Sequence, residues 1–361
     1  MKMTKKIIFS SGGTGGHMFP AINLMKYFSN KGYETLLVTD VRCSHLLKKD
    51  PEVNSHIIRT DTPTNKNFIK KILSLIVIFF SLIKSILILR KEKPSLIFGF
   101  GGYASFPISF TSRFFNIPLV IYESNLVLGR ANKNLLPLSK KILLGTDMPV
   151  NFPEKHKNKV CQVGNILSKE MINYSHIEKN EEGKKFSILV LGGSQGAEIF
   201  GEIVSSVIKM IKDKGYEIEI NQHCLQSQKD LLIEYYKKNK IKNNVFDFTK
   251  NILYLISSSD LAISRSGAST TAELAHTLTP YIAVPYPYSV DDHQYLNAKY
   301  YEEKGCCWVL EQNNFTSINL FNLIMEILKD KKKLKNVREN MKKYSCKNVY
   351  YKIEKAIEEL I

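Results

Sequence analysis

A short apolar segment followed by a glycine-rich turn occurs twice in this chain, and this repeat constrains the fold more than any other feature. The first copy spans residues 5–17 (KKIIFSSGGTGGH) and the second spans residues 186–197 (FSILVLGGSQGA). Each apolar segment is typical of a buried parallel strand, and a helical pattern follows each turn. Glycine lets the backbone approach a ligand closely, and free N–H groups at a helix start attract anions. The repeat predicts two similar α/β domains facing a cleft suited to a phosphorylated substrate.

Two more strand–turn–helix units strengthen this prediction. Residues 95–105 (SLIFGFGGYAS) and residues 261–270 (LAISRSGAST) each pass from an apolar segment into a loop rich in small residues. Strands that alternate with helices form doubly wound parallel sheets, which bind ligands at the carboxyl ends of their strands. The fold class we expect is therefore α/β, with two Rossmann-like domains.

The length of 361 residues allows two domains, each with its own core. Polar segments without periodicity near residues 151–158 and 179–184 indicate the boundary. We expect a first domain over residues 1–160, a second over residues 161–340, and a last helix near residues 341–361 that packs back on the first domain.

Composition limits the class of partner. The net charge of +17 favours an anionic partner such as lipid headgroups or a diphosphate, although a lysine-rich genome bias would also produce it. No nucleic-acid-binding motif is present, so we expect no nucleic acid partner. The six cysteines form neither a CxxC pair nor a zinc spacing, which favours reduced thiols in the cytoplasm. The chain passes directly from Lys5 and Lys6 into the first strand, so no signal peptide is expected.

Residues 72–89 (ILSLIVIFFSLIKSILIL) form an unusually apolar segment with basic flanks. The segment is close to the roughly 20 residues that a spanning helix needs, but Lys84 interrupts it. A spanning helix here would also separate strands of the first sheet. We favour a helix lying on an anionic membrane surface, with Lys70, Lys71, Lys84, Arg90 and Lys91 near the headgroups; a buried helix covering the sheet is the alternative.

Neither glycine turn belongs to a common nucleotide motif. No GK[ST] follows either turn, so neither is a P-loop. In the first turn Met18 stands where a dinucleotide fingerprint has its third glycine. Asp40, at the end of the second predicted strand, does occupy the place of a ribose-binding acid in NAD enzymes. An NAD-dependent oxidoreductase is therefore an alternative that Asp40 supports and Met18 opposes.

Several polar residues are candidates for chemistry. His17 begins a helix, where the positive helix end favours a neutral imidazole that can accept a proton; a capping or packing role is the alternative. Residues 192–197 and 264–270 each offer backbone N–H groups and hydroxyls to phosphate, or act as plain helix caps. Glu273 lies within two turns of the latter helix start, where it would bind both hydroxyls of a ribose or simply favour the helix dipole.

The segment after the fourth loop does not predict a metal site. Asp292 and His293 have no third ligand at a suitable spacing, and the chain contains no Asp-x-Asp motif. Gln294 and Asn297 are three residues apart on one helix face and suit sugar hydroxyls. We therefore expect no metal and no cofactor, with helix N-termini holding a leaving diphosphate in place of a cation.

Together these segments resemble the MurG family of peptidoglycan glycosyltransferases, which add N-acetylglucosamine to lipid I at the cytoplasmic membrane face. The resemblance implies an inverting, metal-independent enzyme of the GT-B fold that is peripheral to the membrane. It rests on seven motifs that follow the family's order between residues 11 and 298: SGGTGGHMFPA, GFGGYASFP, YESN, VGN, LGGSQGA, SRSGASTTAEL and PYPYSVDDHQYLNA.

The resemblance also implies roles for individual residues. In the first domain Thr14, Gly15 and Gly16 would line the cleft between donor and acceptor, and Asn125 would contact the N-acetylglucosamine. In the second domain, the diphosphate would be bound by Ser194 and Gln195 with Ala268, Ser269 and Thr270 beside it, the ribose by Glu273, the sugar hydroxyls by Gln294, and the uracil by the backbone of Thr249.

Two departures from the family pattern stand out. The family has His-Glu-Gln-Asn where this chain has YESN at residues 122–125, and it has a proline and an arginine where this chain has Ile166 and Ser168. Loss of the arginine removes one implied donor contact, which suggests a weaker enzyme, a shifted donor preference or a replacement by neighbouring lysines.

The mechanism expected is an in-line displacement on UDP-N-acetylglucosamine by the 4-hydroxyl of the muramoyl sugar of lipid I, which gives lipid II. His17, helped by Glu123, would take the hydroxyl proton. The alternatives are a GT-B enzyme with another lipid acceptor such as a diacylglycerol, a nucleotide-sugar epimerase, the oxidoreductase above, and a non-catalytic membrane scaffold.

Overall fold

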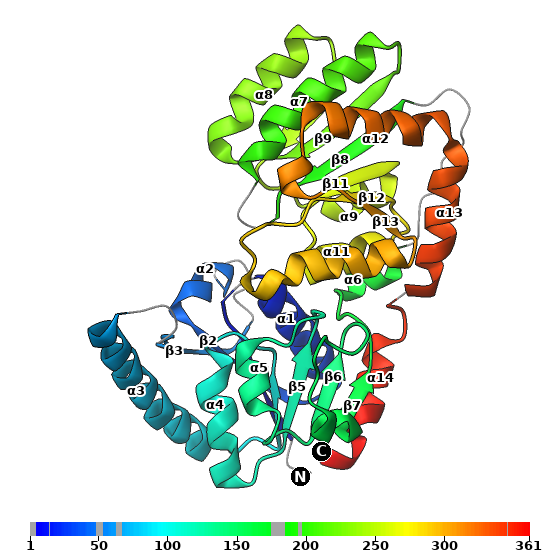
Figure 1. Cartoon of the computed structure of the whole chain (residues 1–361). Helices are drawn as coiled ribbons and strands as arrows, with labels where there is room; N and C mark the ends of the chain where they lie inside the picture. The colour runs from blue at the N-terminus through cyan, green and yellow to red at the C-terminus, as the bar shows by residue number, and fades with distance from the viewer. Residues whose placement is uncertain are drawn as a thin grey trace. The chain divides into compact units, whose positions relative to one another are not determined.

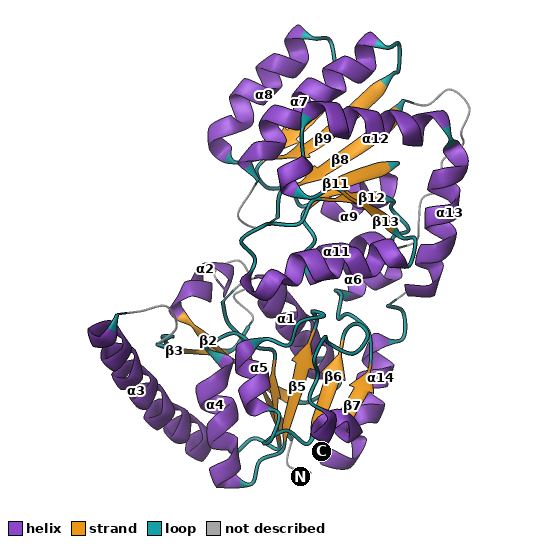
Figure 2. Ribbon diagram, viewed as in Figure 1, coloured by secondary structure: helices purple, strands orange, loops and turns teal. Residues whose placement is uncertain are grey.

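The computed structural model describes residues 5–13, 15–47, 53–62, 67–174, 185–193, 197–344 and 346–361. By its internal contacts the chain divides into unit 1, which is Met1–Ser168 with Lys347–Ile361, and unit 2, which is Lys169–Cys346. These divisions fall a few residues after the expected ones at residues 160 and 340. Each unit contains one parallel sheet flanked by helices (Figures 1 and 2).

Unit 1 is built on a seven-stranded sheet in the order β3-β2-β1-β4-β5-β6-β7, and all neighbouring strands are parallel. The strand order reverses between β1 and β4, which is the topological switch point of a doubly wound sheet. Every residue of β4 and β5 is buried, as expected when helices cover both faces. The strands are β1 (Lys6–Ser10), β2 (Glu34–Asp40), β3 (Ser55–Ile58), β4 (Leu96–Gly99), β5 (Leu119–Glu123), β6 (Lys141–Leu144) and β7 (Val160–Gln162).

The helices of unit 1 include one from the end of the chain. Tyr350 of this last helix stacks on Tyr27 with ring centroids 4.4 Å apart, and Glu354 lies 3.0 Å from the Lys31 ammonium. The C-terminal segment is therefore part of the first domain. The helices are α1 (Gly15–Ser29), α2 (Ser44–Leu47), α3 (Phe68–Glu92), α4 (Ser105–Thr111), α5 (Arg130–Leu135) and α14 (Val349–Ile357).

Unit 2 repeats the arrangement with a six-stranded parallel sheet in the order β10-β9-β8-β11-β12-β13, whose switch point lies between β8 and β11. The predicted class of two doubly wound α/β domains is thus confirmed. The strands are β8 (Phe186–Leu191), β9 (Ile218–His223), β10 (Lys242–Phe246), β11 (Leu261–Ser264), β12 (Tyr281–Ala283) and β13 (Cys307–Val309). The helices are α6 (Lys169–Asn173), α7 (Glu198–Asp213), α8 (Gln226–Lys238), α9 (Ile252–Ser258), α10 (Ala268–His276), α11 (His293–Glu303), α12 (Ser317–Lys329) and α13 (Lys331–Met341).

Candidate active site

Two glycine-rich loops meet at the switch point of unit 1, one after β1 and one after β4. They pack backbone against backbone, because a Cβ on Gly102 would overlap the carbonyl of Gly12 and a Cβ on Gly12 would overlap the side chain of Ala104. Gly13 and Gly102 also have φ of 95° and 75°, which glycine adopts without strain. The glycines are therefore required by the geometry at the point where such sheets bind ligands.

His17 stands in the first turn of α1, directly after the first loop, and is half-buried. Its ring lies beside the second loop, since a Cβ on Gly101 would come 3.3 Å from His17 Cε1. The next residue, Met18, is buried and its Sδ accepts a hydrogen bond from Thr39 Oγ1 of β2 at 3.4 Å. These contacts fix the start of α1, and hence the imidazole, at the switch point.

Glu123 ends β5 and is only 1% exposed. Its Oε1 accepts hydrogen bonds from the backbone N and the Nδ2 of Asn125, both at 3.1 Å. Its Oε2 accepts from Gly129 N at 2.9 Å and from Asn132 Nδ2 at 3.0 Å. The carboxylate therefore accepts hydrogen bonds from four donors, of which three lie in the segment that follows β5 and one lies on α5. These bonds hold Asn125, Gly129 and Asn132 in place, and help from Glu123 to His17 stays a prediction.

Two asparagines depend on Glu123. Asn125, a predicted contact to the sugar, is half-buried and held by the two bonds to Glu123 Oε1. Asn132 is fully buried, and a Cβ on Gly101 would come 3.4 Å from its Nδ2, so it joins this turn to the loop beside His17. Asn132 was not predictable from the sequence, because its partner Glu123 lies nine positions away on another element.

The two departures from the family pattern contact each other. Tyr122 is 2% exposed, and its hydroxyl oxygen accepts a hydrogen bond from the backbone N of Ile166 at 3.1 Å. A proline at position 166 would have no N–H to donate. Tyr350 of α14 holds the next residue, because its hydroxyl donates to the Leu167 carbonyl at 2.6 Å. Two buried tyrosines therefore fix the end of unit 1 just before unit 2 begins.

The switch point of unit 2 carries the second glycine turn and a helix start. Gly193 follows β8 with φ of 79°, and α10 begins after β11 with Gly267 as its N-cap. Gly267 has no side chain with which to cap α10, and the first N–H groups of a helix have no intrahelical partner, so these groups can bind an anion. Ala268, Ser269 and Thr270 carry these first N–H groups, and their contact with a diphosphate stays a prediction.

Arg265 organises this loop, although the sequence analysis gave it no role. It is 9% exposed, and its guanidinium lies over the rings of Phe200 and Tyr286, at 4.9 and 5.4 Å from their centroids. It donates to the Val284 carbonyl at 3.1 Å and to Gln312 Oε1 at 2.7 Å. Burial lowers the pKa of this guanidinium from its usual value, but such a group keeps its charge at neutral pH.

Gln294 and Asn297, the two predicted sugar contacts on α11, have different surroundings. Asn297 is 2% exposed and donates through Nδ2 to the Ser266 carbonyl at 3.2 Å, so it holds the loop between β11 and α10. Gln294 is half-buried, and its Oε1 accepts a hydrogen bond from Tyr286 N at 3.1 Å. Among the described residues, no group of three or more His, Cys, Asp or Glu side chains is placed to hold a metal.

Glu273 is a half-buried carboxyl on α10, with no hydrogen bond from a described residue to its side chain. Burial raises the pKa of Glu273 to about 7. A carboxyl in such surroundings gains most from a ligand that donates two hydrogen bonds, as a ribose does.

The remaining predicted positions carry less structural information. Gly15 and Gly16 open α1 next to His17. Thr249 follows β10, and its Oγ1 accepts a hydrogen bond from Asn251 N at 3.1 Å. Thr14, Ser194 and Gln195 lie outside the described residues.

Helix α3 presents its apolar side to the outside. Its buried residues include the stripe Ser74, Ser81 and Ser85, whereas Phe79 and Phe80 are 58% and 64% exposed. The helix is long and apolar enough to cross a membrane by length and composition alone. The other large apolar side chains exposed on this helix are Phe68, Ile69, Ile72, Leu73, Leu75, Ile76, Ile83 and Leu87.

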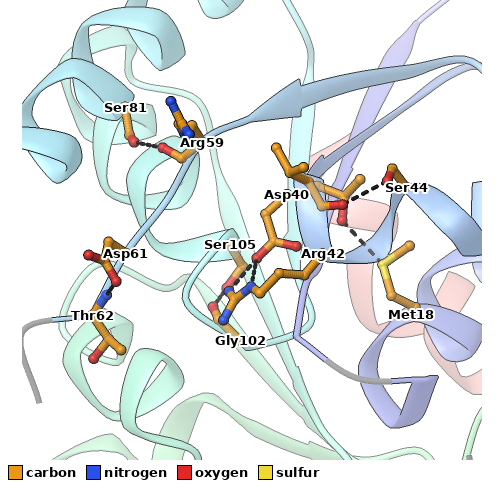
Figure 3. A network of polar contacts seen from close by, with 12 residues as sticks. Met18, Asp40, Arg42, Ser44, Arg59, Asp61, Thr62, Ser81, Gly102 and Ser105 are labelled. Carbon is orange, nitrogen blue, oxygen red and sulfur yellow. Dashed lines mark hydrogen bonds and ion pairs between the residues drawn. The ribbon is translucent and has the colours of Figure 1, made fainter. Parts of the chain in front are cut away.

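Hydrogen bonds tie the serine stripe to the strand segment that precedes α3. Ser81 Oγ donates to the Arg59 carbonyl (Figure 3). Ser74 Oγ donates to Asp61 Oδ2 at 2.9 Å. Lys84 is exposed, and its Nζ donates to the Ile57 carbonyl at 2.7 Å, which adds a further bond between α3 and the end of β3. The helix is therefore anchored by its polar side.

Comparison with known proteins agrees with this geometry. The family model described as "Glycosyltransferase family 28 N-terminal domain" matches residues 7–144. The model described as "Glycosyltransferase family 28 C-terminal domain" matches residues 187–354. The crystal structure of MurG from Acinetobacter baumannii superposes on 98% of this chain and 99% of its own with a TM-score of 0.79 at 24% identity, which defines the fold as GT-B. A co-structure of MnaA from Staphylococcus aureus with UDP shares the fold at a TM-score of 0.68 and 15% identity. The protein is a family 28 glycosyltransferase.

Relatives that match over their full length show which group of family 28 glycosyltransferases the chain belongs to. The UDP-N-acetylglucosamine–N-acetylmuramyl-(pentapeptide) pyrophosphoryl-undecaprenol N-acetylglucosamine transferase of Rickettsia canadensis is 35% identical over 99% of this chain and 100% of its own length. The enzyme of the same name from Pelagibacter ubique is 34% identical over 98% of both chains. The chain belongs to this family of transferases, the MurG family.

Proposed function

We propose that this protein transfers N-acetylglucosamine from UDP-N-acetylglucosamine to the muramoyl sugar of lipid I, which yields lipid II for peptidoglycan synthesis. The observation that carries the proposal is the full-length identity to transferases named for this reaction, together with the family 28 match in both units. The loops at both switch points supply the groups that such a reaction needs.

In the proposed donor site, unit 2 binds the nucleotide. The free N–H groups at the start of α10 and the glycine turn after β8 bind the diphosphate, and Glu273 accepts hydrogen bonds from the ribose. Gln294 Nε2 is available for a sugar hydroxyl, because its Oε1 is already bonded. Ser194, Gln195 and the backbone of Thr249 are assigned to the diphosphate and the uracil by resemblance.

In the proposed acceptor site, unit 1 presents His17. The 4-hydroxyl oxygen of the muramoyl sugar attacks the anomeric carbon, and His17 takes the hydroxyl proton. The bond from that carbon to the diphosphate breaks, its electrons leave with UDP, and the configuration inverts. General-base help of this kind is typically worth about 10²–10⁴-fold in rate. Glu123 contributes by holding Asn125 and Asn132.

The leaving UDP carries negative charge that needs stabilisation. The helix start after Gly267 offers N–H groups and a positive dipole end at the switch point. We propose that these groups replace a divalent cation and that the transfer needs neither metal nor cofactor.

The proposed location is the cytoplasmic face of the membrane, with α3 lying in the interface. Its exposed phenylalanines would enter the lipid, and the basic residues Lys70, Lys71, Arg90 and Lys91 would meet anionic headgroups. The serine stripe that anchors α3 to the protein supports an in-plane arrangement, because a spanning helix would have to leave these contacts.

The test is direct. Purified protein is incubated with radiolabelled UDP-N-acetylglucosamine and lipid I, with and without a chelator, and the label is followed into the lipid fraction. We expect transfer in both samples, and a diacylglycerol acceptor should stay unlabelled. Transfer to diacylglycerol alone, or to no lipid, would contradict the proposal, and loss of transfer with the chelator would contradict metal independence.

A further inference from the structure

A cavity of about 540 Å³ opens in unit 1 beside the proposed acceptor site, at the carboxyl ends of β2 and β3. Within the described part of the chain, no residue of the mechanism above lines it. Its walls come from two short segments of the chain that follow these strands. The lining residues are Asp40, Val41, Arg42, Arg59, Thr60 and Asp61.

One wall contains a buried carboxylate, that of Asp40, in which only one of the two oxygens accepts hydrogen bonds. Asp40 is 2% exposed, and its Oδ2 accepts the Arg42 Nε–H at 2.6 Å and a second bond from Nη2 (Figure 3). Its Oδ1 is buried without a hydrogen-bond partner among the described residues. A buried carboxylate oxygen without a donor is costly, so a ligand that brings an N–H or O–H group would stabilise it.

The opposite wall contains a cationic side chain, that of Arg59. Arg59 is exposed, and its guanidinium forms no hydrogen bond or ion pair with any residue that the structure describes. The neighbouring Thr60 has a buried hydroxyl that is likewise unpartnered within the described part of the chain. Asp61 is already engaged by Ser74 Oγ and by Thr62 N. The groups left to bind a ligand are the Arg59 guanidinium, the Thr60 hydroxyl and Asp40 Oδ1. They suit an anionic oxygen group with a hydrogen-bond donor nearby.

The position of the cavity connects the two parts of the proposed acceptor site. On one side, the Cys43 thiol that follows Arg42 lies against the backbone of Gly13 in the loop before His17. On the other side, the Arg59 carbonyl and Asp61 are bonded to the serine stripe of α3, the helix proposed to lie on the membrane. A lipid-linked sugar whose reacting hydroxyl is at His17 would thus carry its other polar groups past this cavity.

We propose that this cavity is a recognition subsite for an anionic group of the lipid-linked acceptor. Arg59 and Arg42 bind a carboxylate or phosphate, and Asp40 Oδ1 and Thr60 accept or share hydrogen bonds from an adjacent N–H or hydroxyl. Guanidinium groups suit both anions because they present paired N–H donors. The mixed charge of the lining favours a group that carries both an anion and donors, as a peptide does. The inference rests on the proposed function.

The test uses Arg59→Gln, because Arg59 is exposed and its loss should leave the fold intact. Arg113→Gln is the matched control, since Arg113 is an exposed arginine of the same unit that does not line the cavity. With lipid I we expect Arg59→Gln to raise the acceptor KM about tenfold while the UDP-N-acetylglucosamine KM and kcat stay close to wild type. Thr60→Val should raise the acceptor KM by a smaller factor.

A peptide-free muramoyl diphosphate lipid identifies the source of the anion. If the KM effect of Arg59→Gln disappears with this acceptor, the ligand is a peptide carboxylate; if the effect persists, it is the diphosphate. An acceptor KM in Arg59→Gln equal to that of Arg113→Gln with both acceptors would overturn the inference, even if the wild type transfers normally. Calorimetric binding of a soluble muramoyl pentapeptide diphosphate provides a readout that needs no transfer: a failed transfer assay with tight wild-type binding and weak Arg59→Gln binding would reject the function and keep the subsite.

Discussion

At the residue scale, the sites of this protein are held by buried polar side chains that do not themselves need to touch a substrate. Three of these side chains form hydrogen bonds that hold a loop with a candidate ligand-binding group: Glu123, Arg265 and Asn297. Tyr122 does the same for the segment at the end of unit 1. Breaking one such bond leaves a buried donor or acceptor unpaired, so each bond can be tested by a substitution of one of its partners.

The hydrogen bond between Tyr122 and Ile166 predicts coupled substitutions. Tyr122→Phe should lower the free energy of unfolding by about 1–2 kcal/mol, because the buried Ile166 N–H loses its acceptor. Ile166→Pro removes the donor, so it should cost less in the Tyr122→Phe background than in the wild type. Urea denaturation of the four proteins measures this coupling. Tyr236→Phe, in the other unit, is the control and should be additive with Ile166→Pro; additivity in both cycles would contradict the prediction.

Burial of Glu273 predicts a pH dependence of stability. Because the folded pKa is raised to about 7 from a usual 4.5, the folded state keeps a proton that the unfolded state releases. The stabilisation is fully present below pH 4.5 and is lost as pH rises through 7. The wild type should therefore lose on the order of 3 kcal/mol between pH 4.5 and 8 that Glu273→Gln does not lose. Equal slopes of unfolding free energy against pH in the two proteins would show that the pKa of Glu273 is not raised in the folded state.

The same carboxyl predicts how the nucleoside binds. Ribose hydroxyls donate to the ionised form, so the affinity for uridine, which has no group titrating between pH 6 and 8, should rise up to about tenfold over this range. Glu273→Gln should bind uridine weakly and without this pH dependence. Calorimetry at pH 6, 7 and 8 measures both, and a flat wild-type profile would remove Glu273 from the ribose site.

At the scale of elements, the sequence predicts what is local and misses what is tertiary. The strands before each glycine turn, the helix starts at His17 and Ala268, and the parallel order were predictable, because apolar periodicity and glycine spacing lie within about ten residues. The bonds from Glu123 to Asn132 and from Arg265 to Gln312 were not, since they join separate elements. The serines of the α3 stripe can be read from the sequence, but their position does not tell which side of the helix faces the protein. Only the contacts of this helix with residues 57–61 show that.

This orientation of α3 leads to a prediction about membranes. Phe79→Glu with Phe80→Glu places charges on the exposed side, so binding to vesicles with anionic lipid should fall at least tenfold while the fold persists. Leu231→Glu is the matched control, because Leu231 is 70% exposed on α8 of unit 2 and should bind vesicles like the wild type. Vesicle sedimentation measures the bound fraction. Equal binding of all three proteins would show that α3 is not the membrane contact.

At the scale of the whole molecule, the chain repeats one architecture and gives each copy a different task. Both units are doubly wound sheets with glycine turns at their switch points. Unit 1 presents a histidine there, whereas unit 2 presents an uncapped helix start and a carboxyl with a raised pKa. Base catalysis and nucleotide binding should therefore be separable by mutation.

His17→Ala and Glu273→Gln test this separation. His17→Ala should lower kcat about 10²–10⁴-fold and leave the Kd for UDP unchanged, because the nucleotide site is proposed to lie in unit 2. Glu273→Gln should raise the Kd for UDP, since the ribose loses its ionised acceptor. Transfer kinetics and calorimetric titration with UDP at pH 8 measure the two effects on the same preparations. A His17→Ala protein that transfers at the wild-type rate would remove His17 as the base. A His17→Ala protein that binds UDP as weakly as Glu273→Gln would show that base catalysis and nucleotide binding are not separated between the two units.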